Sequence, residues 1–141
     1  MANYCSTART NYFRVTDEEE YINLFEGLYG YEDAVHDFTE ERESTLWHGF
    51  GSYSSICWRE NPNEEPETTG LDEFYGRLQK ILPDDEAFIY MEAGAEKLRY
   101  VVGAADIVTN KGIRTMEMTD LAIENARQML NNPDFRTKVS Y

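Results

Sequence analysis

The sequence predicts a single domain, residues 1–141, of the α+β class, with an antiparallel sheet of four to six strands and three helices. The length of 141 residues suits one compact domain, and 41% apolar with 28% charged residues is a globular composition. Three segments carry apolar residues at helical spacing, and the rest has aromatic and β-branched runs broken by turn residues. The order of these elements allows a ferredoxin-like core (βαββαβ) with an extra strand and a C-terminal helix.

The first helix is expected to begin at Thr16 and to end at Gly30. Thr16 is a good N-cap residue, and Glu19 three positions later completes a capping box. Gly30 supplies the left-handed residue that often ends a helix. One apolar stripe runs between them and consists of Tyr21, Ile22, Phe25, Leu28 and Tyr29. We therefore expect an amphipathic helix that packs on the rest of the domain.

The other two helices are expected to start near Thr69 and at Thr119. Pro83 stops the second helix, because a proline cannot donate to the helical ladder. Asn131-Asn132-Pro133 closes the third helix. The small residues of the third helix suit a close approach to a sheet.

Strand signals fill the segments between the helices. Ala93-Gly94-Ala95 and Asn110-Lys111 interrupt these signals and are expected to form two hairpin turns. The expected strands are 11–15, 34–39, 47–58, 86–91, 98–102, 104–109 and 112–118.

Acidic residues dominate the charge of the chain. Thirteen Lys and Arg stand against 27 Asp and Glu, which gives a net charge of −14. Segment 32–67 contains ten acidic and two basic residues, so it contributes −8 of that total. Because binding to nucleic acid or to anionic lipid needs a basic face, we expect no direct contact with either.

The expected compartment is the cytoplasm. No apolar run reaches the ~18–20 residues that cross a bilayer. The first residues lack the basic and apolar regions of a secretory signal, so Cys5 and Cys57 are expected to stay reduced.

The residues do not support an enzyme, and we expect no catalytic residue, no metal site and no cofactor. His36 and His48 belong to no HxH, HExxH or CxxC pattern. Cys57 lies in an aromatic and acidic setting that makes a poor nucleophile. An enzyme would need a pocket that holds one of the two histidines against a carboxylate.

Paired carboxylates are abundant, which weakens each pair as a sign of a site. Glu92 and Glu96 flank Gly94 and could form a cation site across the expected turn. Lys97 nearby offers an ordinary ion pair instead.

The acidic loops around the central strand are the best candidates for a functional surface. Duplex DNA carries one charge per ~1.7 Å of axis, so 14 net charges match roughly 24 Å of duplex. We expect the loops to occupy a basic groove that another protein uses for nucleic acid, with Tyr31 as an aromatic anchor. The candidate contacts are Glu40, Glu41, Glu43, Glu64, Glu65 and Glu67.

Several segments resemble small acidic accessory proteins of bacterial mobile genetic elements. They are ANY (2–4), STARTNYF (6–13), MEAG (91–94), LRYVVG (98–103) and ARQMLNNP (126–133). The resemblance implies an anti-defence role of the anti-CRISPR or antirestriction type, acting by DNA mimicry on a CRISPR effector or restriction enzyme. It assigns no functional residue.

A second hypothesis belongs to another class. The protein would be an immunity-type or scaffolding domain whose partner meets an apolar sheet or helix face, while the acidity serves solubility. A homodimer is compatible with either hypothesis.

Overall fold

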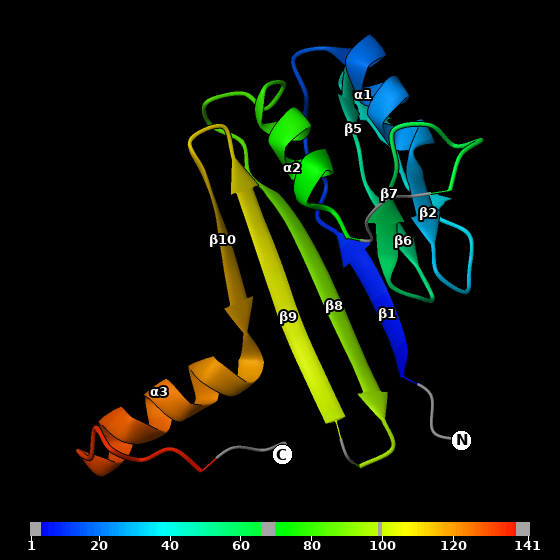
Figure 1. Cartoon of the computed structure of the whole chain (residues 1–141). Helices are drawn as coiled ribbons and strands as arrows, with labels where there is room; N and C mark the ends of the chain where they lie inside the picture. Colours follow the sequence, from blue (N-terminus) through cyan, green and yellow to red (C-terminus); the bar gives the residue numbers. More distant parts are fainter. Residues whose placement is uncertain (1–3, 66–69, 99, 138–141) are drawn as a thin grey trace.

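The computed structural model describes residues 4–65, 70–98 and 100–137. Its main feature is a six-stranded sheet with the strand order β10-β9-β8-β1-β6-β3, in which every pairing is antiparallel (Figure 1). The strands of this sheet are β1 (Cys5–Thr10), β3 (His36–Asp37), β6 (Phe50–Ser52), β8 (Phe88–Glu96), β9 (Tyr100–Thr109) and β10 (Gly112–Glu117).

Three helices and two small sheets complete the fold. The helices are α1 (Glu18–Glu26), α2 (Asp72–Gln79) and α3 (Met118–Leu130). The small sheets pair β2 (Leu28–Gly30) with β7 (Ile56–Trp58), and β4 (Glu40–Arg42) with β5 (Thr45–Trp47). The predicted α+β class, with six strands in the main sheet and three helices, is thus confirmed. The predicted ferredoxin-like core (βαββαβ) is present as β1, α1, β3, β6, α2 and β8, because these strands have the spatial order β8-β1-β6-β3 with antiparallel neighbours. Strands β9 and β10 and helix α3 extend this core.

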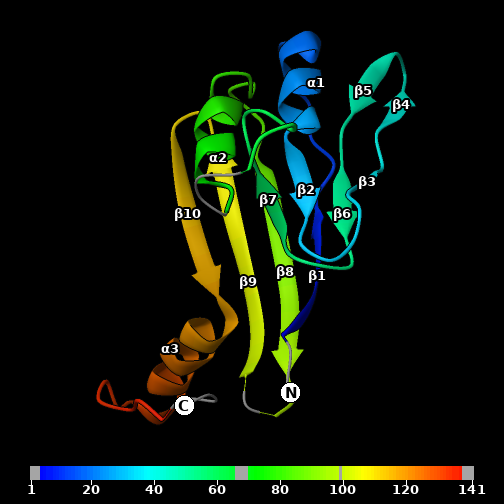
Figure 2. The same cartoon turned by 45° about the vertical axis from the view of Figure 1, so that its right-hand side comes forward.

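The elements are divided between the two ends of the long β8–β9 hairpin. Figure 2 shows α1 and α2 at one end, with the β4–β5 hairpin standing off beside them, and α3 at the other end. Among the described residues, no helix is long and apolar enough to cross a membrane.

The core lies at the end that carries α1 and α2. Its centre is a group of four fully buried phenylalanines: Phe13, Phe50, Phe74 and Phe88. Phe88 of β8 meets Phe13 and Phe74 edge-on, with ring centroids 5.0 and 5.9 Å apart. Edge-to-face pairs of this kind add about 0.5–1.5 kcal/mol to the gain from burying the rings. These rings join α2 and the segment before α1 to the sheet.

The first helix is shorter than the sequence predicts, and it begins one residue past the expected cap. Asp17 is the N-cap residue, and its carboxylate accepts a hydrogen bond of 3.0 Å from the Glu20 N–H. Thr16 instead donates through its backbone N–H to the Ile81 carbonyl, 2.7 Å away. The helix ends at Gly27, and Leu28–Gly30 pairs with β7 as strand β2. Pairing with β7 therefore overrides the helical spacing of the last two apolar residues.

Two further expectations differ from the structure around β8 and β9. The segment 93–95 is not a turn but the interior of β8, and β9 is one continuous strand. The chain reverses after Glu96, where Lys97 has a positive φ of 50°. Position 94 needs a glycine because a Cβ there would lie 2.6 Å from the Cys5 carbonyl oxygen and from the Tyr4 side chain.

Other expected elements also differ. The segment 11–15 forms only an isolated bridge between Phe13 and His48, because the first strand, β1, lies before it, and the expected strand 47–58 is divided among the end of β5, β6 and β7. Segment 34–39 contains only the two-residue strand β3, and α2 begins at Asp72. Thr69, where we expected that helix to start, lies outside the described residues. Helix α3 begins at Met118, one residue before Thr119.

Candidate functional site

Three adjoining hollows run from β1 and the segments around β7 to the part of β8 and β9 that lies beside α2. The largest, about 540 Å³, opens between β1 and the segments that flank β7. The second, about 360 Å³, shares Ser55 and Cys57 with the first. The third, about 180 Å³, shares three residues with the second. We call the combined feature the tyrosine groove and define it by Tyr4, Tyr31, Glu32, Tyr53, Ser55, Tyr75, Tyr90, Glu92 and Asp106.

Glu92 is the best-held carboxylate of the tyrosine groove. Tyr4 and Ser55 donate to its Oε2 at 3.2 and 3.1 Å, and Tyr90 donates to its Oε1 at 2.9 Å. Its neighbours across the sheet are the small residues Ala8 and Ala104, which leave room for these hydroxyls. Three neutral donors therefore surround one half-buried carboxylate.

Asp106 is held in the same way on the neighbouring strand. The Tyr75 hydroxyl donates to its Oδ2 at 2.6 Å, and the Thr115 hydroxyl donates to its Oδ1 at 2.8 Å. Burial raises the pKa of Tyr75 and Tyr90 far above the ordinary value, and the nearby carboxylates raise each pKa further. Both phenols consequently stay neutral and keep donating to the carboxylates.

The groove is acidic because, in the part of the chain that the structure describes, its carboxylates have no cationic partner. None of the described residues that line the three hollows is Lys or Arg. Within the described part of the chain, neither Glu92 nor Asp106 forms a salt bridge. Hydrogen bonds from neutral hydroxyls stabilise these charges without cancelling them. A cationic group of a ligand would supply the missing charge.

Two exposed tyrosines stand at the mouth of the groove. Tyr31 and Tyr53 are each 76% exposed, and both line the largest hollow. Asp33 fixes the loop that carries Tyr53, since its Oδ2 accepts from the Tyr53 N–H at 3.1 Å. That hydrogen bond and a second one with His36 lower the pKa of Asp33. Tyr31, the aromatic anchor expected from the sequence, thus lies at the groove.

The acidic residues predicted from the sequence fall into two separate groups, neither of them in the groove. Glu40, Glu41 and Glu43 lie together on the β4–β5 hairpin, where Glu40 forms an ion pair with Arg42. Glu64 and Glu65 lie in the loop after β7.

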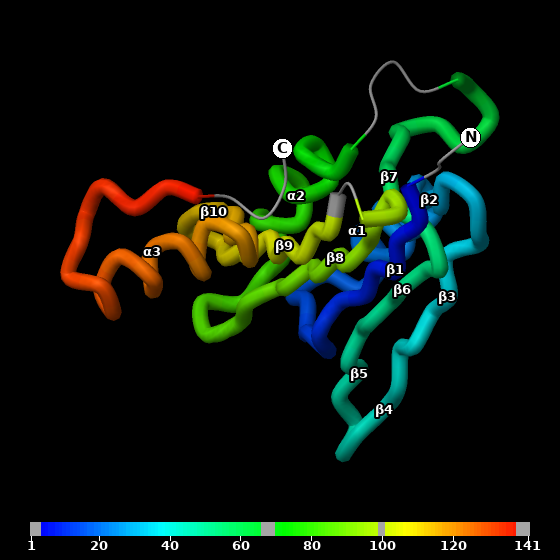
Figure 3. The backbone as a smooth tube through the Cα atoms, turned by 90° about the horizontal axis from the view of Figure 1, so that it is seen from below, coloured from blue at the N-terminus to red at the C-terminus, as the bar shows by residue number. Residues whose placement is uncertain are grey.

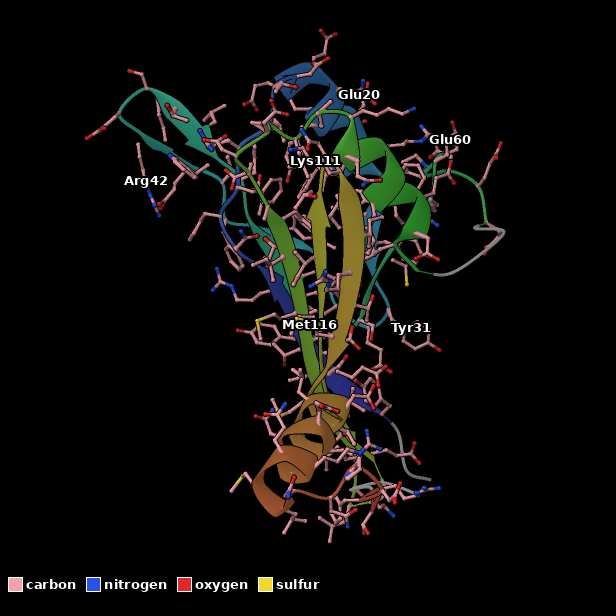
Figure 4. The ribbon with its side chains drawn as sticks, turned by 90° about the vertical axis from the view of Figure 1, so that its left-hand side faces the viewer. Glu20, Tyr31, Arg42, Glu60, Lys111 and Met116 are labelled. Carbon is pink, nitrogen blue, oxygen red and sulfur yellow. The ribbon has the colours of Figure 1, made fainter. Side chains whose placement is uncertain are left out.

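Figure 4 shows how far apart these two groups are. Arg42 of the hairpin and Glu60 of the loop appear on opposite sides of the sheet. The structure therefore does not join the two acidic segments into one surface. Glu67 lies outside the described residues.

The two histidines serve the surrounding structure and lie outside the groove. His48 is 4% exposed, and its ring stacks on Tyr21. Its Nε2 lies 2.6 Å from the Glu18 carboxylate, and its Nδ1 lies 3.1 Å from the Thr39 hydroxyl. It therefore links α1 to the base of the β4–β5 hairpin. His36 lies on the surface, 2.9 Å from Asp33. Among the residues that the structure describes, no group of three or more His, Cys, Asp or Glu could hold a metal ion.

Comparison of the chain with protein-family models, with curated proteins and with solved structures finds no match.

Proposed function

We propose that this protein is a non-enzymatic cytoplasmic inhibitor or adaptor that binds the basic, nucleic-acid-binding surface of a bacterial defence nuclease. The observation that carries the proposal is the tyrosine groove, where all the side-chain donors that the described residues offer to Glu92 and Asp106 are neutral hydroxyls. A net charge of −14 supports a basic partner, because it attracts such a partner over a distance.

The chemistry of the groove suits an Arg or Lys side chain of the partner. Aromatic faces attract these cations, and Tyr31 and Tyr53 offer exposed rings at the mouth. Beyond the mouth, Glu92 and Asp106 provide acceptors for the cationic head. Tyrosines beside charged residues are typical hot spots of an interface, because the rings bury surface area while the charges orient the partner.

The two acidic segments on either side have a different role in this proposal. Glu40, Glu41 and Glu43 on the hairpin, and Glu64 with Glu65 on the loop, steer the partner during approach. Charges at the rim of an interface mainly change the association rate and its salt dependence. Buried hydrogen-bonded charges mainly change the dissociation rate.

This division of roles gives the experiment. Nucleases captured from bacterial lysate at low salt are purified and their binding kinetics are measured with three forms of the protein. Wild type is compared with the groove variant Glu92→Gln/Asp106→Asn and with the rim variant Glu64→Gln/Glu65→Gln. We expect the groove variant to dissociate at least tenfold faster, and the rim variant to associate more slowly with little change in dissociation.

Two results would contradict the proposal. One is a partner whose binding does not weaken between low and moderate salt, because screening must reduce a charge-driven contact. The other is a groove variant that binds like wild type.

The second hypothesis, a scaffolding or immunity-type domain, is favoured by the opposite side of the sheet. The register places Met91 and Val101 there, and they are 58% and 55% exposed. A partner docked on that side predicts that Met91→Asp abolishes binding while the groove variant retains it.

A further inference from the structure

Asp106 occupies a central position in the tyrosine groove. The strand register places it between Tyr90 of β8 and Thr115 of β10, and residues directly opposite each other on neighbouring strands share a face of the sheet. Figure 3 shows β9 between β8 and β10, with α2 above it. Donors therefore reach the Asp106 carboxylate from two directions: Thr115 from the neighbouring strand and Tyr75 from the helix.

The two carboxylates of the groove differ in the hydrogen bonds that they can still accept. A carboxylate has about four acceptor positions, two on each oxygen. Donors from the described residues take two positions on Oε2 of Glu92 and one on its Oε1. On Asp106 they take one position on each oxygen. Toward the described part of the chain, Asp106 thus keeps one position on each oxygen, whereas Glu92 keeps a single one on Oε1.

One open position on each oxygen of a carboxylate is the pattern that a guanidinium fills. The planar head group of arginine presents parallel N–H groups that match the two oxygens, whereas the ammonium of lysine is a point charge without this fork. A guanidinium is also more weakly hydrated than an ammonium, so it loses less when it leaves water for a groove. Both properties favour arginine at Asp106.

The hollow of about 180 Å³ beside Glu92 and Asp106 offers space for such a head group. Ala104, which also lines it, lies directly opposite Glu92 and two residues before Asp106, so the two carboxylates are diagonal neighbours on one face. A guanidinium has five N–H donors, and two of them would bind Asp106. The open position on Oε1 of Glu92 borders the same hollow and can accept a further one.

We propose that the tyrosine groove selects arginine over lysine, and that Asp106 determines this specificity by accepting two hydrogen bonds from one guanidinium. The inference rests on the proposed function, because it names the side chain through which the basic partner enters the groove.

Two short peptides that differ only in their cation test the proposal. Capped Gly-Arg-Gly and capped Gly-Lys-Gly are titrated into the isotope-labelled protein, and NMR shifts of the amides at positions 92 and 106 give the dissociation constants. The arginine peptide should bind wild type about tenfold more tightly, because it makes one additional hydrogen bond to a charged group.

Three variants assign the preference to one residue. Asp106→Asn keeps the shape of the side chain but has one acceptor oxygen in place of two, so the two peptides should bind it within about twofold of each other. Glu92→Gln should weaken both peptides and keep the preference for arginine. Glu19→Gln removes an exposed carboxylate of α1, outside the groove, and should leave the preference unchanged.

The contrary results separate this inference from the proposed function. Equal binding of the two peptides to wild type overturns the selection of arginine, yet the groove would still be a cation site. Wild type that binds neither peptide contradicts the proposed function and the inference together. A folded Asp106→Asn variant that keeps the preference overturns the role of Asp106. The comparison in wild type needs no variant, so it decides the selection of arginine whether or not Asp106→Asn folds.

Discussion

Alkaline pH should unfold this protein steeply, because three buried tyrosines stay neutral in the folded state. Burial is the main cause that raises the pKa of Tyr21, Tyr75 and Tyr90, and neighbouring carboxylates raise each pKa further. In the unfolded chain, each phenol ionises near the ordinary pKa of ~10. The stabilising contribution is therefore complete below pH ~10 and is lost as the pH rises above it.

The size of the effect follows from proton counting. Above pH ~10 the unfolded chain has released a proton from each of the three tyrosines that the folded state retains. The free energy of unfolding then falls by about 1.4 kcal/mol per pH unit for each tyrosine, or about 4 kcal/mol for the three. Small domains have total stabilities of about 5–15 kcal/mol, so one or two pH units remove much of it.

Urea unfolding from about pH 8 to about pH 11.5 measures this slope. Tyr75→Phe should lower stability by about 1.5–3 kcal/mol at neutral pH, because the hydrogen bond to Asp106 is lost. The same substitution should reduce the alkaline slope by about a third. Tyr53→Phe, on a side chain that is 76% exposed, is the matched control and should leave the slope unchanged. A slope that persists in the triple variant with Phe at all three buried positions would refute the reasoning.

Three further substitutions test local structure, and each is measured as the free energy of unfolding. Asp17→Ala removes the side chain that caps α1 and should cost about 1 kcal/mol; an unchanged stability would show that the cap at Asp17 is unimportant. Gly76→Ala should stabilise α2 by about 1 kcal/mol, because a Cβ there meets no atom within 4 Å. Gly94→Ala should destabilise the protein, because its Cβ would lie 2.6 Å from backbone and ring atoms. If Gly76→Ala and Gly94→Ala changed the stability equally, this explanation would be wrong.

Local sequence signals predicted the elements whose stability depends on their own residues. The strand expected at 86–91 is the first part of β8, and the three amphipathic segments each contain a helix. The errors occur where contacts far apart in sequence decide the structure. Leu28 and Tyr29 have helical spacing but pair with β7, and Gly94 serves a close approach of β1 rather than a turn.

The candidate site, too, depends on contacts between residues far apart in the sequence, which local patterns do not predict. Tyr90 and Glu92 are two residues apart on a strand, so the alternation of side chains predicts that they share a face. Asp106 and Tyr75 join them only through the register of β8 with β9 and the position of α2, which no short sequence pattern contains. The acidic loops were expected to act together, yet one extends from β4 and the other follows β7.

The placement of the phenylalanine rings at one end of the hairpin has a consequence for how the molecule opens. Outside the principal hydrophobic cluster, Ile123 is the buried apolar residue that α3 contributes. Regions with few buried apolar contacts exchange their amide hydrogens through openings much smaller than global unfolding. We therefore expect α3 and the far half of the hairpin to exchange first, while the amides around Phe88 exchange only when the whole chain unfolds. The tyrosine groove lies between the core around Phe88 and the end that carries α3. A ligand that spans the groove would therefore also slow the exchange of amide hydrogens near α3.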